Sequence, residues 1–100
     1  MTNRLPFNEW SKKAIKERGK VATSRTKKYE GDPRVEWISP PLPLSFIKQY
    51  FYKLEGARSP DELQRVINQI FRKNVSEDRE FYVHFGDFSD EVEREDFKDD

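Results

Sequence analysis

Few residues of this sequence are of the types that perform acid–base, nucleophilic or metal chemistry. It contains one histidine, His84, and no cysteine, which excludes thiol nucleophiles and thiolate zinc sites. His84 lies in an alternating strand pattern, where a histidine usually packs or faces solvent, and no second histidine, serine or aspartate is predictably beside it. The sequence therefore predicts no catalytic residue and no enzyme.

Metal and cofactor sites are also not predicted. Asp87, Asp90 and Glu91 form a tight group of carboxylates, but they lack the residue spacing and the glycine of an EF-hand loop. A solvated acidic turn explains them. The four glycines are isolated, so no glycine-rich loop is present that would cradle a phosphate. We expect no cofactor, no metal and no small-molecule substrate.

A basic segment is the strongest indication of a binding function. Residues 11–28 contain eight lysines and arginines against one acidic residue, Glu17, and aromatic side chains stand at both margins. Flexible basic segments bind phosphate backbones through counterion release, and flanking aromatic rings stack on bases. The residues predicted to contact nucleic acid are Lys12, Lys13, Lys16, Arg18, Lys20, Arg25, Lys27, Lys28 and Tyr29. A solvated helix face with a basic linker, or a segment that binds an acidic protein surface, explains the same pattern.

Charge is sorted along the chain although its net value is zero. Residues 1–36 hold ten basic against five acidic residues, whereas residues 75–100 hold three basic against eleven acidic residues. This asymmetry predicts a basic arm and an acidic tail on either side of a folded middle. We divide the chain into a basic helix and mobile arm at 1–33, a folded core at 34–88, and a flexible acidic tail at 89–100.

The expected fold is a small single α+β domain. Hydrophobic periodicity predicts helices over 6–18, 44–55 and 59–73 and strands over 34–38 and 80–85, with a mobile or partner-ordered connector at 19–33. Helix 59–73 is the clearest, because Ser59 is a good N-cap and Pro60 stands at the first helical position. Helices 44–55 and 59–73 then form a hairpin packed on a short two-stranded sheet, in which Val35 and Trp37 point inward.

The helical hairpin is not predicted to read DNA. In a helix-turn-helix protein the first turn of the second helix enters the major groove, whereas here that turn contains Asp61 and Glu62, which repel phosphates. The proline-rich segment 40–43 has a PxxP spacing, but a stiff entry into the next helix explains it better.

Three functions remain open. The first is a small accessory or regulatory protein that docks on a larger protein or nucleoprotein complex and contacts RNA or DNA through the basic arm. The second is a protein-only adaptor, inhibitor or assembly factor, in which the arm and the acidic tail are both docking segments. The third is a structural subunit held in a large complex. Aromatic side chains expected at the partner contact are Trp10, Trp37 and Tyr52. No apolar stretch approaches the length of a membrane span and no secretion signal is visible, so we expect a cytoplasmic protein.

Overall fold

The computed structural model describes residues 4–92. Its elements in chain order are α1 (Glu9–Arg18), β1 (Ala22–Arg25), β2 (Val35–Ile38), β3 (Leu42–Pro43), α2 (Leu44–Tyr50), α3 (Pro60–Phe71) and β4 (Glu80–Gly86). Residues 89–92 are also helical. The expected α+β class is confirmed.

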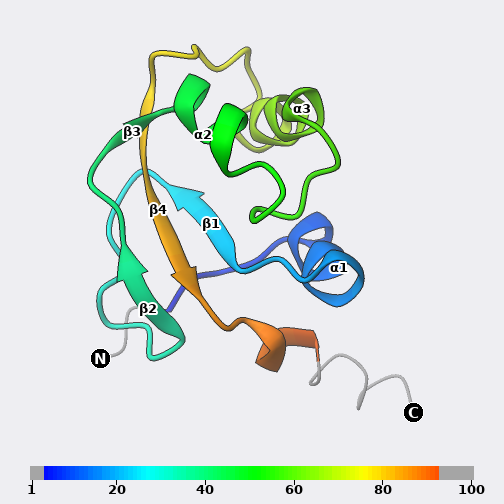
Figure 1. The fold of residues 1–100 in the computed structure, drawn as a ribbon, viewed down its shortest axis with the longest axis vertical. Helices are drawn as coiled ribbons and strands as arrows, with labels where there is room; N and C mark the ends of the chain where they lie inside the picture. Colours follow the sequence, from blue (N-terminus) through cyan, green and yellow to red (C-terminus); the bar gives the residue numbers. More distant parts are fainter. Residues whose placement is uncertain (1–3, 93–100) are drawn as a thin grey trace.

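The sheet is built around β4, which pairs antiparallel with each of the other three strands. β1 lies on one side of β4 and β2 on the other, and β3 continues the path of β2 along β4 (Figure 1). The two predicted strands are present as β2 and β4. The prediction of only two strands is wrong, because β1 and β3 complete a four-stranded sheet.

The break between β2 and β3 falls at Pro40 and Pro41, which have no backbone N–H to donate. Ser39 maintains the connection to β4 at this point. Its N–H donates to the carbonyl of Val83 at 2.9 Å, and its hydroxyl oxygen accepts from the N–H of Val83 at 2.9 Å. The Ser39 hydroxyl thus accepts the hydrogen bond that the N–H of Val83 would otherwise donate to a backbone carbonyl, and it keeps this edge of the sheet in place.

Helix α3 forms as its sequence predicts. The Ser59 side chain accepts a hydrogen bond from the N–H of Glu62 at 3.1 Å, and Pro60 is the first helical residue. Its buried face presents Leu63, Val66 and Ile67 to the core. Helix α2 is shorter than the predicted 44–55, because it ends at Tyr50 and buries only Leu44 and Ile47.

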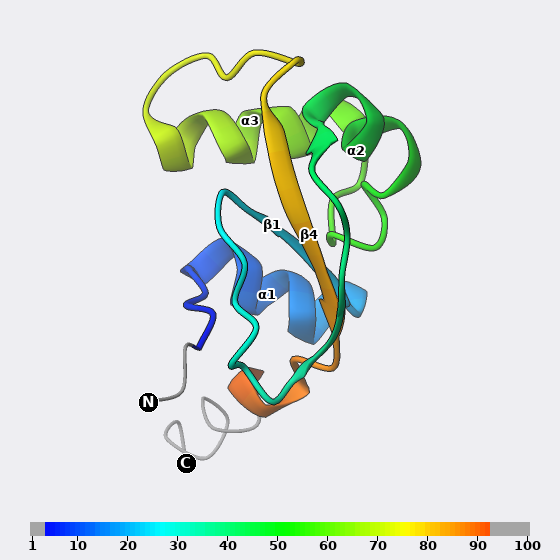
Figure 2. The same ribbon diagram turned by 90° about the vertical axis from the view of Figure 1, so that its left-hand side faces the viewer.

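Helix α1 belongs to the folded body. Asn8 caps it through Ser11 N–H at 2.8 Å, and Gly19 ends it in the left-handed conformation. Its buried side packs against residues 54–57, so closely that a Cβ added at Gly56 would lie 2.6 Å from the Cβ of Ala14. Figures 1 and 2 show α1 and α3 on the same side of β4, one above the other.

The prediction of a mobile connector at 19–33 is wrong. Residues 22–25 form β1, whose register pairs Ala22 with Phe85 and Arg25 with Tyr82. Asp32, which lies further along the same segment, is 2% exposed. The local sequence does not alternate there, so the strand depends on hydrogen bonding to β4.

Two hydrophobic clusters stabilise the domain. The larger fills the space between the sheet and helices α2 and α3, and its fully buried members include Leu44, Ile47, Leu63, Phe81 and Val83. The smaller joins Leu5 and Ile15 to Phe88, which lies more than 70 residues further along the chain. Of the predicted acidic tail, residues 93–100 lie outside the described part of the chain. Within the described part, no helix has the length and apolar character needed to cross a membrane.

Candidate functional site

The residues predicted to bind nucleic acid lie in three different environments. Four lysines are exposed, namely Lys13 and Lys16 on α1 and Lys27 and Lys28 on the loop after β1. The half-buried members are Lys12, Arg18, Arg25 and Tyr29. Lys20 is buried. The basic segment is therefore not one continuous exposed arm.

Lys20 forms a buried ion pair that faces the protein interior. Its Nζ lies 2.7 Å from the backbone oxygen of Glu55 and 3.5 Å from Oε1 of the same residue. The hydroxyl of Ser24 donates to the other carboxylate oxygen. Burial lowers the pKa of Lys20, and the charge of Glu55 opposes that shift. With its residue only 3% exposed, the Lys20 ammonium does not reach an external phosphate, which corrects the prediction for this residue.

Two arginines of the basic segment are also bonded within the protein. Arg18 Nη1 donates to the backbone oxygen of Gly56 at 3.3 Å, and Arg25 Nη2 donates to the backbone oxygen of Pro6 at 2.7 Å. Burial lowers the pKa of Arg25, although Tyr29 and Glu55 act against this. The first contact ties the C-terminal end of α1 to Gly56, and the second ties β1 to the segment that precedes α1.

A second ionic cluster was not predicted from the sequence. Arg34 donates to both carboxylate oxygens of Asp32, at 3.0 and 2.6 Å, and its Nη1 donates to Glu91 at 2.7 Å. Leu5 contributes its N–H to Asp32 and its carbonyl to Arg34. Burial raises the pKa of Asp32, but the hydrogen bonds from Arg34 and Leu5 outweigh it and hold that pKa well below its usual range. The cluster joins residues 5, 32–34 and 91.

The most distinctive surface is a row of five aromatic rings that we call the aromatic strip: Trp37, Phe85, Phe51, Phe46 and Tyr50. Along the row, consecutive ring centroids lie 5.2, 5.5, 5.7 and 4.7 Å apart. Tyr50 is 60% exposed, Trp37 55% and Phe46 39%, while Phe51 and Phe85 are half-buried against the core. The strip joins the sheet to helix α2.

Trp37 reaches this surface because β2 is irregular. The pairing with β4 shifts register between Val35 and Trp37, which interrupts the strict alternation of side chains between the two faces. The prediction that Trp37 points inward is therefore wrong, and Val35 is half-buried. The other two predicted partner contacts, Trp10 and Tyr52, are half-buried and pack against the core.

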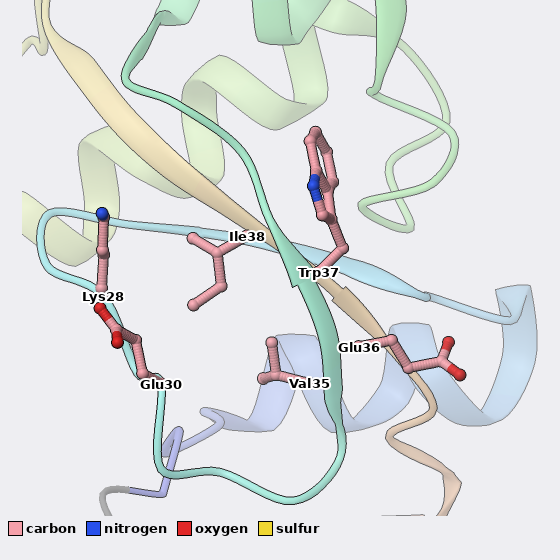
Figure 3. A pocket seen from close by; sticks show the side chains of 6 residues that line it. All are labelled: Lys28, Glu30, Val35, Glu36, Trp37 and Ile38. Carbon is pink, nitrogen blue, oxygen red and sulfur yellow. The ribbon is translucent and has the colours of Figure 1, made fainter.

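A groove of about 410 Å³ runs beside β2 (Figure 3). Lys28 and Glu30 of the β1–β2 loop form one wall, and the side chains of Val35 and Ile38 point toward them from the strand. Glu36 and Trp37 also line the groove, but their side chains point away from Lys28 and Glu30. β2 is the last strand on this side of the sheet, so one edge of its backbone faces away from β4.

His84 packs inside the protein and both of its ring nitrogens are engaged. Nε2 accepts the backbone N–H of Tyr29 at 3.0 Å, and Nδ1 lies 3.0 Å from the carbonyl oxygen of Tyr82. Burial lowers the pKa of His84. Among residues 4–92, no group of three or more His, Asp or Glu side chains is arranged to hold a metal ion.

Of these features, only the aromatic strip combines large exposed apolar area with a fixed position on the scaffold. Each ring was visible in the sequence, but their adjacency depends on the register of β2 and β4 and on where α2 ends. Comparison of the chain with protein-family models, curated proteins and solved structures gives no match.

Proposed function

We propose that this chain is a non-enzymatic protein-docking domain, an adaptor, inhibitor or assembly factor whose partner contacts the aromatic strip. The observation that supports this is the row of five rings, three of which are substantially exposed. Aromatic side chains supply much of the binding energy of protein interfaces, and a contiguous exposed apolar patch on a small domain marks such an interface.

The strip is also positioned rigidly, which favours tight binding. Phe51 and Phe85 are half-buried against the core, and each contacts an exposed ring of the strip. Because these side chains are already held by packing, a partner immobilises few additional rotamers on binding. The strip therefore has the pre-organisation expected of an interface centre.

The charges beside the strip favour a protein partner over a polyanion. Glu36 directly precedes Trp37, and Lys53 lies two residues after Phe51. Both charged side chains are exposed, and their charges are opposite in sign. Recognition of a phosphate backbone requires a predominance of cations, whereas protein interfaces commonly have a mixed polar rim around an apolar centre.

Contact with RNA or DNA is the second candidate function. The observation that favours it is the set of four exposed lysines, Lys13, Lys16, Lys27 and Lys28. The slope of log K against log[salt] is about −0.9 for each phosphate neutralised on a duplex, so four lysines give a slope of at most about −4. A salt titration with mixed RNA and duplex DNA measures this slope directly, and absence of binding at low salt removes this candidate.

The docking proposal is tested with a strip variant and a matched control. The double substitution Trp37→Ser and Tyr50→Ser removes two exposed rings, and Ile70→Ser removes an apolar side chain that is 54% exposed and lies outside the strip, on α3. Thermal unfolding followed by circular dichroism first establishes that each variant retains the parent transition. Each protein is then used for quantitative affinity purification from untreated and from nuclease-treated lysates of the native cell.

We expect the strip variant to lose, by at least about 30-fold in affinity, the protein that the parent and the Ile70→Ser control both retain. This corresponds to the loss of at least about 2 kcal/mol at an aromatic interface centre. Equal recovery with the parent and the strip variant would contradict the proposal. If nuclease treatment alone abolishes recovery, nucleic-acid contact is the better explanation.

A further inference from the structure

The loop between β1 and β2 is fixed to the sheet through the side chain of His84. This side chain lies in the middle of β4 and is fully buried. Its Nε2 accepts the N–H of Tyr29 at 3.0 Å, although the two residues are 55 positions apart in sequence. The rings of Tyr29 and His84 also meet edge to face, with centroids 5.7 Å apart. This imidazole therefore holds the Tyr29 end of the loop, and the buried Asp32, bonded to Leu5 and Arg34, holds its other end.

Only one protonation state of His84 satisfies both contacts. A neutral imidazole has one N–H donor and one acceptor nitrogen. Nδ1 faces the carbonyl of Tyr82, so it carries the hydrogen, and Nε2 is left as the acceptor for Tyr29. A second proton would place an N–H on Nε2, pointing at the N–H of Tyr29. Protonation therefore removes the hydrogen bond between Tyr29 and His84 and places two donors against each other.

Some of the groups around His84 raise its pKa and others lower it. Burial lowers its pKa, and the cation of Arg25 on β1 adds to that effect. The carbonyls of Thr23 and Tyr82 and the carboxylate of Asp32 raise it. The carboxylate of Asp32 is already paired with Arg34, which limits how far its charge stabilises a protonated His84.

We propose that His84 is a proton-sensitive anchor: at neutral pH it holds the β1–β2 loop on the sheet, and acidification releases the loop while the sheet remains folded. A histidine in water has a pKa near 6.5, and the pKa of His84 is lower while the loop is in place. Protons therefore bind His84 more tightly when the loop is released. Release then grows as the pH falls below about 6.5. Lys28 and Glu30 leave with the loop, which opens the groove beside Val35 and Ile38. This inference does not depend on the docking function.

Hydrogen exchange of the Tyr29 amide, measured by NMR at pH 7.5 and pH 5.0 and corrected for intrinsic rates, tests the proposal. Protection of Tyr29 should fall at pH 5.0 by up to about 30-fold, the limit set by a released histidine that titrates 1.5 pH units higher. The amide of Val83, which donates to Ser39 in the sheet, should keep its protection and serves as the internal control.

His84→Gln supplies the second measurement, because a glutamine oxygen can accept from Tyr29 but does not titrate. Tyr29 protection in this variant should not differ between the two pH values. Should the variant fail to fold, the wild-type comparison decides alone. Unchanged Tyr29 protection in the wild-type protein overturns the proposal, and so does an equal loss at Val83, which would indicate global unfolding.

Discussion

Replacing Glu55 by leucine should be among the most destabilising single changes in this domain. The substitution leaves the ammonium of Lys20 buried with only the backbone oxygen of residue 55 as an acceptor, and it removes the acceptor of the Ser24 hydroxyl. Removing one partner of a buried ion pair costs about 3–5 kcal/mol, and the orphaned hydroxyl adds about 1 kcal/mol. The total free energy of unfolding of a domain of this size is about 5–15 kcal/mol, so the substitution removes a large part of its stability.

Urea denaturation followed by circular dichroism and tryptophan fluorescence measures the effect. The double variant Lys20→Met with Glu55→Leu should recover most of the loss, because an apolar pair of similar volume needs no compensation for buried charge. Glu36→Leu, at an exposed position, serves as a control and should change the free energy of unfolding by no more than about 0.5 kcal/mol. A Glu55→Leu protein within about 1 kcal/mol of the parent, or a double variant no more stable than the single one, would refute this reasoning.

Three further outcomes are expected. Ile67→Asp places an unpaired charge on the buried face of α3 and should abolish the folded state at 25 °C, so a cooperative thermal transition near that of the parent would contradict it. Gly86→Ala puts a Cβ 2.0 Å from the backbone oxygen of Arg34 and should lower the free energy of unfolding, measured in urea, by at least about 1 kcal/mol. An unchanged midpoint of urea unfolding would show that the segments of Gly86 and Arg34 move apart without cost. The pKa of Asp32 is lower in the folded than in the unfolded state, so its contribution to the free energy of unfolding is present above pH 4 and is lost on acidification. Asp32→Asn should therefore be less stable at pH 7, and its free energy of unfolding should depend less on pH between pH 5 and 2. Parallel plots of this free energy against pH for the two proteins would exclude this role.

The elements that the sequence predicts well are those whose determinants are local. Helix α3 has its cap at Ser59, proline at its first position and an apolar stripe at helical spacing, all within thirteen residues. Gly19 ends α1 for a similarly local reason, since glycine adopts the left-handed conformation without strain. Strand β4 follows from the alternation of Phe81, Val83 and Phe85 with polar residues.

The elements that were missed depend on partners distant in sequence. Ala22–Arg25 has no alternating pattern and becomes a strand because it pairs with residues 82–85. The exposure of Trp37 follows from a register shift in β2, which no periodicity reveals. Lys20 looked like part of a basic arm because its partner, Glu55, lies 35 residues away.

The aromatic strip was hidden for a related reason. Phe46, Ile47, Tyr50, Phe51 and Leu54 fall on one side of a helix over 44–55, a spacing typical of a buried face. In the structure α2 stops at Tyr50, and only Leu44 and Ile47 enter the core from it. Sequence periodicity identifies an apolar face, but it does not say whether another element covers that face.

The central place of β4 has a consequence for biosynthesis. Three chain segments, 22–25, 35–38 and 42–43, hydrogen-bond to β4 and to no other strand among residues 4–92, yet β4 is the last of the four to be translated. The nascent chain thus emerges from the ribosome with three strands that have nothing to pair with, and the sheet assembles only after Gly86 has left the exit tunnel. Closing such long loops makes formation of the sheet slow, because the entropy of loop closure is lost before the strands gain their hydrogen bonds, and the unpaired segments stay exposed during that interval.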